Sequence, residues 1–248
     1  MIAKAAFVRG AGLVCLMAVL LAGVGCSGSK VTTKSSHELP RYQIRTLALL
    51  PFTTIATPQL RDQADLFMST PEGLRRSDIS IGVQSNVEPL SRQTVTVPSA
   101  AAEKVMQLFW NRLKNRSGLV VSSPGDAGKA ADSLGWDLHK ITPEMMAAAV
   151  AKKLKQDAAL IGQVLVYQER VGSRLGANPP ASVGFEIKVV AADGQVLWVG
   201  NYYERQRPMT EDFMGFIHRW AFVTADELAE YGVDELLKEF PFGAGGEK

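Results

Sequence analysis

The sequence predicts a single α/β domain in which a mixed central sheet of about five strands is flanked by helices. Three observations support this prediction. Compact apolar runs alternate along the chain with amphipathic segments. Asp193-Gly194 separates two strand-like segments as a hairpin turn would. Thr142 and Thr224 precede segments with the pattern of a helix start. Strands and helices that alternate in this way pack in layers around one core.

The first half of the domain is expected to begin with a buried strand at residues 44–52, which Pro51 ends. Residues 53–97 contain prolines and scattered apolar residues. A structureless loop of this length is uncommon in a compact domain, so a functional excursion is expected here, with a short helix at 59–68 and a hairpin at 79–97. A helix capped by Ser99 follows at 99–116, and then a short strand at 119–122.

The second half begins with residues 124–138, whose small and polar residues indicate a loop with a helical turn. A helix is expected after Thr142, because a proline and an acid follow this capping residue. Residues 158–167 are nearly continuously apolar and predict a central strand. Residues 182–190 alternate cleanly, and the Asp193-Gly194 turn leads into a partner strand at 196–205. Two last helices are expected after Thr210 and after Thr224, the second with a capping box.

The N-terminal segment predicts a signal peptide at residues 1–25. Lys4 and Arg9 precede an uncharged apolar stretch that is shorter than the roughly 20 residues of a bilayer span. The small residues before Cys26 resemble the lipobox of bacterial lipoproteins, which implies acylation of Cys26 and a membrane anchor. Ser27 stands where enteric lipoproteins kept at the inner membrane have Asp, which implies the outer membrane. An ordinary secretory signal is the alternative, because Gly23 replaces the usual Leu of that motif.

Composition sets the domain boundaries and excludes several partners. Residues 26–41 are polar and predict a lipidated flexible tether, followed by the folded domain at 42–242 and a disordered tail at 243–248. Without Lys4 and Arg9 the 27 basic residues become 25, which equals the 25 acidic residues. A neutral chain gives no electrostatic reason to bind nucleic acid. Cys15 and Cys26 are the only cysteines, so neither a disulfide nor a zinc–cysteine site is expected in the mature chain.

The sequence offers no catalytic constellation. His37, His139 and His218 are isolated and lack the spacing of metal ligands. The adjacent acids Glu211–Asp212 and Asp234–Glu235 lie in expected helices, where acids near a helix start more often interact with the helix dipole than with substrates. We therefore expect no catalytic residue, no metal and no cofactor, and we expect that the protein is not an enzyme.

The layout resembles a known group of bacterial envelope lipoproteins. LALLPF, an amphipathic helix, GLVVSS, DAALIGQVLVYQERVG and a hairpin ending DGQVLWVGNYYERQRP follow one another in this order. The group includes the periplasmic domain of the curli secretion channel, the lipoprotein activators of penicillin-binding proteins and the N-terminal domain of TolB, and the chain looks closest to uncharacterised members. Because those proteins act by binding other envelope proteins, the resemblance implies a partner-binding role.

The resulting hypothesis is a non-enzymatic outer-membrane lipoprotein that displays its domain in the periplasm and binds another envelope protein. Aromatic and arginine side chains dominate protein contacts, and the candidate contact residues are Trp198, Tyr202, Tyr203, Arg205, Phe216 and Trp220. For Trp198 a place in the core is the favoured interpretation, and a contact role is the alternative. The excursion and the loop at 172–180 are further candidate contact elements. The alternative functions are a self-assembling ring or secretion-channel-like subunit and, less favoured, an envelope hydrolase.

Overall fold

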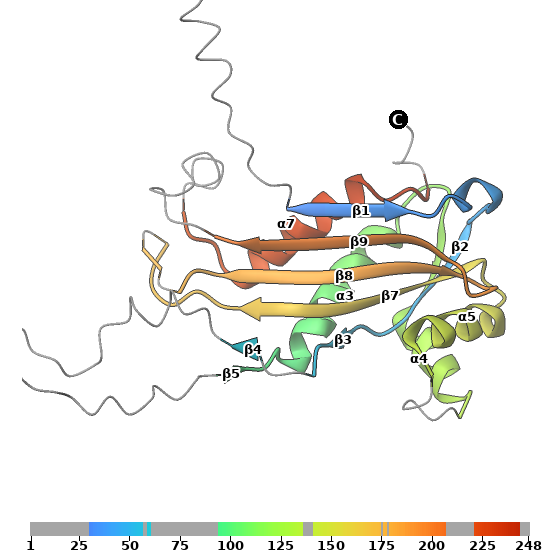
Figure 1. The fold of residues 1–248 in the computed structure, drawn as a ribbon, viewed down its shortest axis with the longest axis horizontal. Coiled ribbons are helices and arrows are strands. Elements are labelled where there is room, and N and C mark those ends of the chain that lie inside the picture. The colour runs from blue at the N-terminus through green and yellow to red at the C-terminus, as the bar shows by residue number, and fades with distance from the viewer. Residues whose placement is uncertain are drawn as a thin grey trace, which may run out of the picture. The chain divides into compact units, whose positions relative to one another are not determined.

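A seven-stranded mixed sheet lies at the centre of the structure, a computed structural model that describes residues 30–56, 59–60, 94–135, 141–174, 176–177, 179–206 and 221–243. The strands follow the order β1-β9-β8-β7-β2-β6, and β3 pairs with β7 beyond the end of β2 (Figure 1). Their bounds are β1 Val31–Ser35, β2 Thr46–Leu49, β3 Thr53–Thr54, β6 Val120–Ser122, β7 Ala158–Gln168, β8 Ser182–Ala191 and β9 Val196–Arg205. The predicted α/β class with a mixed, helix-flanked sheet is confirmed.

The three long strands β7, β8 and β9 form the antiparallel centre of this sheet. Their side chains alternate between the two faces, as the period-two pattern predicted. On one face of β8 the side chains of Val183, Phe185, Ile187 and Val189 are fully buried. Glu186 and Lys188, which lie between them, point to the other face and are half-buried. The prediction for residues 182–190 is therefore confirmed.

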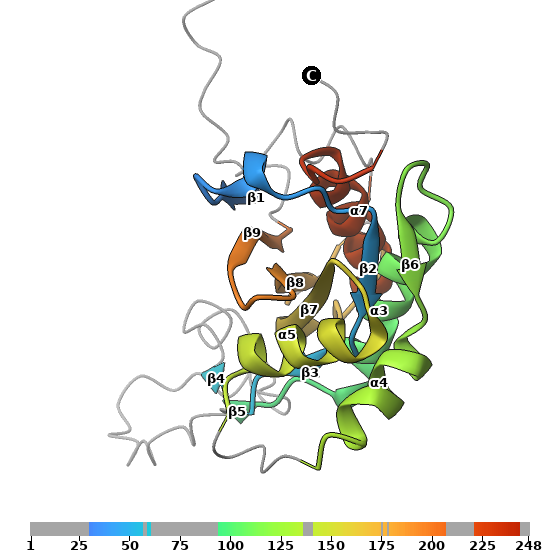
Figure 2. The ribbon, with the colours of Figure 1, turned by 90° about the vertical axis from the view of Figure 1, so that its right-hand side faces the viewer.

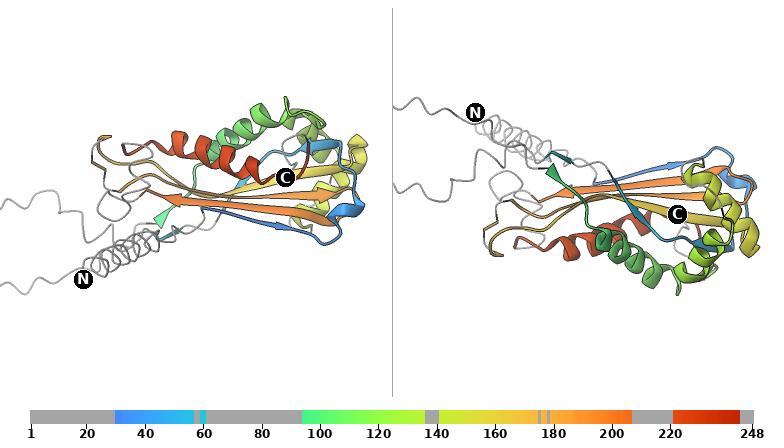
Figure 3. Two further views of the ribbon diagram at one scale, coloured as in Figure 1. Left: turned by 90° about the horizontal axis from the view of Figure 1, so that it is seen from above. Right: turned by 90° about the horizontal axis from the view of Figure 1, so that it is seen from below.

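Helices pack on both faces of the sheet, and those on the second face lie at one end of it (Figure 2 and Figure 3). The apolar face of β7–β9 packs against α3 (Ser99–Leu113) and α7 (Ala225–Lys238), and these elements share the larger core cluster. A second cluster joins α4 (Pro124–Asp132) and α5 (Pro143–Leu154) to Ala48, Ala159 and Val190, which point to the opposite face. In the part of the chain that the structure describes, no helix has the length and apolarity needed to cross a membrane.

The predicted flexible tether at residues 26–41 is wrong for its second part, because the folded domain begins at Val31. Strand β1 pairs antiparallel with β9, with Val31 opposite Tyr202 and Ser35 opposite Trp198. A 3-10 turn, η1 (Leu39–Arg41), follows it. An edge strand needs only one face against the core and can otherwise be polar. Its composition alone therefore resembles that of a linker, whereas Val31 packs against the core.

Three further expectations are corrected. Residues 124–132 form the helix α4 and not a loop, since the Ser123 side chain accepts a hydrogen bond from the Asp126 amide at 3.2 Å. The residue that caps α3 is Pro98, without a side-chain hydrogen bond, in place of Ser99. Within the excursion, Gln59–Leu60 form strand β4, where a helix was expected, and this strand pairs with β5 (Thr94–Val95). The helix after Thr210 and most of the excursion lie outside the described residues.

Close backbone approach at Gly232 lets α7 pack on the sheet. A Cβ atom at Gly232 would overlap the ring of Tyr202, which is 1% exposed. The Tyr202 hydroxyl donates a hydrogen bond of 2.7 Å to the buried Glu204 carboxylate, and this bond fixes the ring in place. A larger residue at 232 must therefore displace either the ring or the helix.

We expect Gly232→Ala to lower the free energy of unfolding by about 1–3 kcal/mol, the usual cost of overpacking a core. The matched control is Gly125→Ala in α4, where an added Cβ would have the Ser123 hydroxyl at 3.9 Å as its nearest contact. Urea unfolding measures both variants. Equal stabilities would contradict the packing described for α7.

Candidate functional site

The alternation of β9 separates the predicted contact residues. Trp198 and Tyr202 point into the core between the sheet and α7, and each is only 1% exposed. Tyr203 and Arg205 point to the opposite face, where Tyr203 is 57% exposed. Buried side chains cannot contact a partner, so the structure removes Trp198 and Tyr202 from the candidate surface. Cys26, Phe216 and Trp220 lie outside the described residues.

The exposed part of the sheet is organised around the ring of Tyr203. Strand pairing places Gly184 beside Tyr203 and Val166 beside Gly184. The absence of a side chain at Gly184 leaves room for the tyrosine ring, whose Cδ2 atom would lie 3.0 Å from an added Cβ. Arg205 follows on the same face. We call Val166, Gly184, Tyr203 and Arg205 the Tyr203 face.

Helix α5 limits this face toward the other end of the strands. Lys188 donates a hydrogen bond of 2.9 Å to Glu144 on α5 and lies 3.1 Å from Glu186 on its own strand. The hydrogen bond from Lys188 lowers the pKa of Glu144. These charged side chains interact with one another within the domain. Among the aromatic side chains of β9, Tyr203 is the exposed one.

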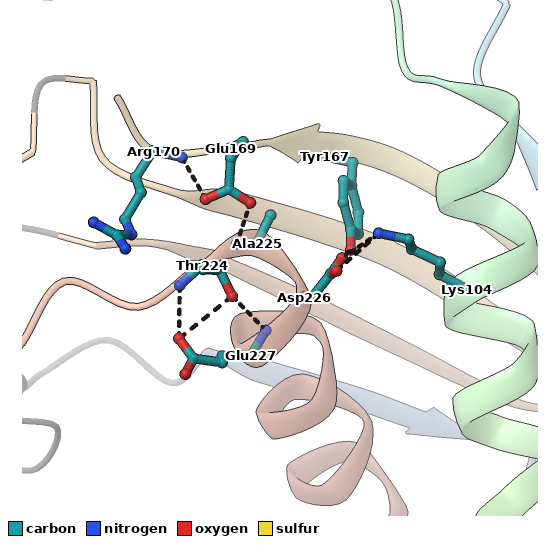
Figure 4. Close-up of polar contacts among 8 residues, drawn as sticks. All are labelled: Lys104, Tyr167, Glu169, Arg170, Thr224, Ala225, Asp226 and Glu227. Atoms are coloured by element: carbon teal, nitrogen blue, oxygen red, sulfur yellow. Dashed lines mark hydrogen bonds and ion pairs between the residues drawn. The ribbon is translucent and has the colours of Figure 1, made fainter. Parts of the chain in front are cut away.

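A cluster of polar side chains lies on the other side of the sheet, around the first turn of α7 (Figure 4). We call this cluster the α7 clasp, and it consists of Lys104, Tyr167, Glu169, Thr224, Asp226 and Glu227. Its members come from α3, from β7 and the residue after it, and from the start of α7. The clasp therefore joins three elements that are far apart in the sequence.

The clasp satisfies backbone groups that a helix start leaves without partners. Glu169 accepts a hydrogen bond of 3.0 Å from the Ala225 amide. Thr224 and Glu227 form the predicted capping box, with each side chain accepting from the backbone amide of the other residue at 3.2 and 2.8 Å. The negative charge of these acids also suits the positive end of the helix dipole. The predicted capping box is confirmed.

Asp226 joins the helix start to both neighbouring elements. Its carboxylate accepts two hydrogen bonds of 2.8 Å from the Lys104 ammonium and one from the Tyr167 hydroxyl. Lys104 first, and then Tyr167, lower the pKa of Asp226. Burial and the hydrogen bond to Asp226 raise the pKa of Tyr167. Asp226 thus stays ionised and Tyr167 stays protonated at neutral pH.

The acids of the clasp are occupied by structural partners. Glu169 also accepts from the Arg170 amide at 3.0 Å, and Glu227 accepts from the Arg174 guanidinium at 3.4 Å. The adjacent acids Asp234 and Glu235 also have structural partners. Arg112 binds Asp234 and Lys238 binds Glu235. No group of three or more potential metal ligands occurs within the described residues.

No motif in the sequence indicates that Lys104, Tyr167 and Glu169 belong to one cluster. Their positions on α3 and β7 are unremarkable in sequence, and they meet Asp226 only because β7 and α3 both pack beside α7. The one weak signal of a polar cluster is that the charged residues Glu169 and Arg170 directly follow an otherwise apolar strand.

Replacement of Thr224 by Ala should destabilise the protein by about 0.5–2 kcal/mol, because the Glu227 amide loses its capping acceptor. Thr224→Ser keeps the hydroxyl and is the matched control. Urea midpoints, with unchanged slopes, measure the difference. A Thr224→Ala variant as stable as Thr224→Ser would contradict the capping role.

The lowered pKa of Asp226 predicts that the stability of the protein depends on pH. Since its folded-state pKa is lowered, its stabilising contribution is present above the unfolded-state pKa of about 3.9 and is lost as the pH falls through the folded-state value. Asp226→Asn should therefore be less stable than the wild-type protein at pH 7, and the difference should shrink below about pH 4. Unfolding curves at several pH values measure it. A difference that persists in acid would assign the effect to packing.

Comparison with known proteins finds no matching family model and no matching curated protein. Several solved structures have a similar arrangement. They include the PelC dodecamer from Paraburkholderia phytofirmans, with a TM-score of 0.43, 13% identity and coverage of 86% of this chain and 97% of that chain. Lipoprotein GNA1162 from Neisseria meningitidis has a TM-score of 0.38, 12% identity and coverage of 79% and 98%. The LpoB C-terminal domain from Escherichia coli has a TM-score of 0.34, 11% identity and coverage of 76% and 93%. At these values the similarity concerns the arrangement of elements and assigns no role to this chain.

Proposed function

We propose that this protein is a non-enzymatic lipoprotein of the outer membrane that holds a periplasmic α/β domain at the membrane and binds another cell-envelope protein. The observation that carries this proposal is the order of the N-terminal segments. An uncharged apolar stretch ends at Gly25-Cys26, and a folded domain begins at Val31. A signal peptide, an acylated cysteine and a folded domain follow one another in this order in bacterial lipoproteins.

The hydrogen bonds that the polar side chains make within the domain support a binding role over a catalytic one. A catalytic acid or base must reach a substrate. In the α7 clasp, Glu169, Asp226 and Glu227 are instead directed at backbone amides, Lys104 and Arg174. Their removal would be expected to cost stability, and we assign them a structural role.

The Tyr203 face is the surface that we assign to the partner. An exposed tyrosine next to an arginine has the composition of a contact hot spot, since tyrosine supplies a large rigid surface and arginine several donors. Tyr203 lies on a long central strand, and such a rigid position limits the entropy lost on binding. The partner that fits is a folded envelope protein that covers the ring and offers acceptors to Arg205.

Site-specific photo-crosslinking in intact cells tests this function. A photoreactive phenylalanine analogue at Tyr203 should give an adduct with one envelope protein, and its yield should fall when Arg205 is changed to Ala. The matched control position is Tyr231 on α7, which is 38% exposed and lies in the opposite layer. Equal adducts at both positions, or none at Tyr203, would refute the assignment. An adduct with a second copy of this chain would favour the self-assembling alternative.

The anchor is tested separately by Cys26→Ser. This change removes the only thiol that can be acylated after loss of the signal peptide. The variant should leave the membrane fraction, since the acyl chains supply the binding free energy. A variant that sediments with membranes as the wild type does would overturn the lipoprotein assignment.

A further inference from the structure

Strand β1 leaves only a short link between the proposed anchor and the folded domain. This step rests on the acylation of Cys26 proposed above. Residues 27–30 alone separate Cys26 from Val31. Five residue steps span at most about 18 Å when fully extended, whereas a tether as far as residue 41 would span up to about 54 Å. Because acylation holds Cys26 at the lipid headgroups, Val31 must lie close to the membrane surface.

The strand register shows at which end of the sheet Val31 lies. Val31 lies opposite Tyr202 on β9, three residues before Arg205. Arg205 lies opposite Ser182 on β8, and Ser182 lies opposite Gln168 on β7. Val31 is thus about 10 Å along the strands and about 14 Å across them from the end of β7, at usual strand spacings.

The end of the sheet where the chain enters β1 also carries the loop between β7 and β8 (Figure 1). The turn between β8 and β9, with α4 and α5, lies at the other end (Figure 1). The loop extends beyond the ends of the strands that it connects. A membrane within reach of Val31 would therefore meet this loop before it meets the opposite end of the domain.

The loop presents an apolar side chain that is held in place. Val171 is 58% exposed, although its amide donates a hydrogen bond of 2.9 Å to the Pro179 carbonyl. Arg170 donates a hydrogen bond to the Gly172 carbonyl at 3.0 Å. The Phe222 amide donates to the Arg174 carbonyl at 2.8 Å, which fastens the loop to the segment before α7. An exposed valine next to an arginine suits the boundary between headgroups and acyl chains.

The acids at this end do not oppose a membrane contact. Glu169 binds two backbone amides. Asp226 is paired with Lys104, and Glu227 with Arg174. The ion pairs of Asp226 and Glu227 reduce the repulsion between these two carboxylates and anionic headgroups.

We propose that the end of the domain that carries the β7–β8 loop faces the lipid bilayer, with Val171 and the neighbouring Arg170 in contact with the headgroups. The occupant of this surface is the membrane to which Cys26 is attached, because the short link brings that membrane within reach. The Tyr203 face, which runs along the strands, then stands roughly perpendicular to the membrane and is accessible to a protein partner from the side.

Depth-dependent fluorescence quenching tests this orientation with the full acylated chain. The chain is reconstituted in vesicles of phosphatidylethanolamine and phosphatidylglycerol that contain a nitroxide-labelled lipid. Cys26 is blocked by its acyl group, so a single introduced cysteine carries the fluorophore. The test position is Val171→Cys, and the matched control is Gln195→Cys in the exposed turn at the opposite end. Quenching should be several-fold stronger at position 171.

A second variant tests the role of the short link. Insertion of about twelve Gly and Ser residues between residues 29 and 30 adds a flexible segment. It should reduce the difference in quenching between the two positions while the protein still sediments with the vesicles.

The outcomes separate this inference from the proposed function. Equal quenching at positions 171 and 195 overturns the orientation and leaves the anchor intact. A difference that survives the insertion contradicts the role of the short link in setting the orientation. A mature chain whose mass lacks acyl groups overturns the proposed function itself. Stronger quenching at position 195 would place the α4–α5 end on the membrane and would also overturn the inference.

Discussion

The alternation of side chains along the antiparallel strands β7, β8 and β9 is the constraint on which the rest of the structure depends. One face of these strands is apolar and fully buried, and both α3 and α7 pack on it. The register between strands cannot shift by one residue without moving this face to the solvent. The same constraint separates Tyr202 from its neighbour Tyr203. The first ring fills the space above Gly232 in the core, and the second lies exposed on the opposite face.

The start of α7 depends on this sheet in turn. Its backbone amides are satisfied partly by its own capping box and partly by Glu169, which follows β7. Asp226 binds Lys104 of α3 and Tyr167 of β7. The helix is therefore fixed at the end of the sheet where the β7–β8 loop lies, and that loop is fixed through Arg174. Hydrogen bonds at Val171 and Arg174 hold the described part of this loop, so Val171 can be presented to a flat surface at little entropic cost.

The edge strand β1 connects the fold to the proposed location of the protein. With Cys26 acylated as proposed, a domain whose first strand begins at Val31 cannot turn freely above the membrane as a domain on a long tether could. In our proposals the loop end of the sheet faces the membrane and the Tyr203 face contacts a partner. The first proposal depends on the pairing of β1 with β9, and the second on the alternation of side chains along β9.

The sequence by itself determined the α/β class, the strands predicted at 158–167, 182–190 and 196–205, and the capped helices after Thr142 and Thr224. These elements have strong local signals, because apolar periodicity and capping residues act over a few positions. The tertiary structure alone decided that residues 31–35 are a strand, since a polar edge strand gains its order from hydrogen bonds to β9 and not from its own composition. It alone decided that Tyr202 belongs to the core, because its burial depends on α7, whereas a core position was already favoured for Trp198. The α7 clasp likewise exists only where three distant segments pack together, and side chains so far apart in sequence carry no local signal of their meeting.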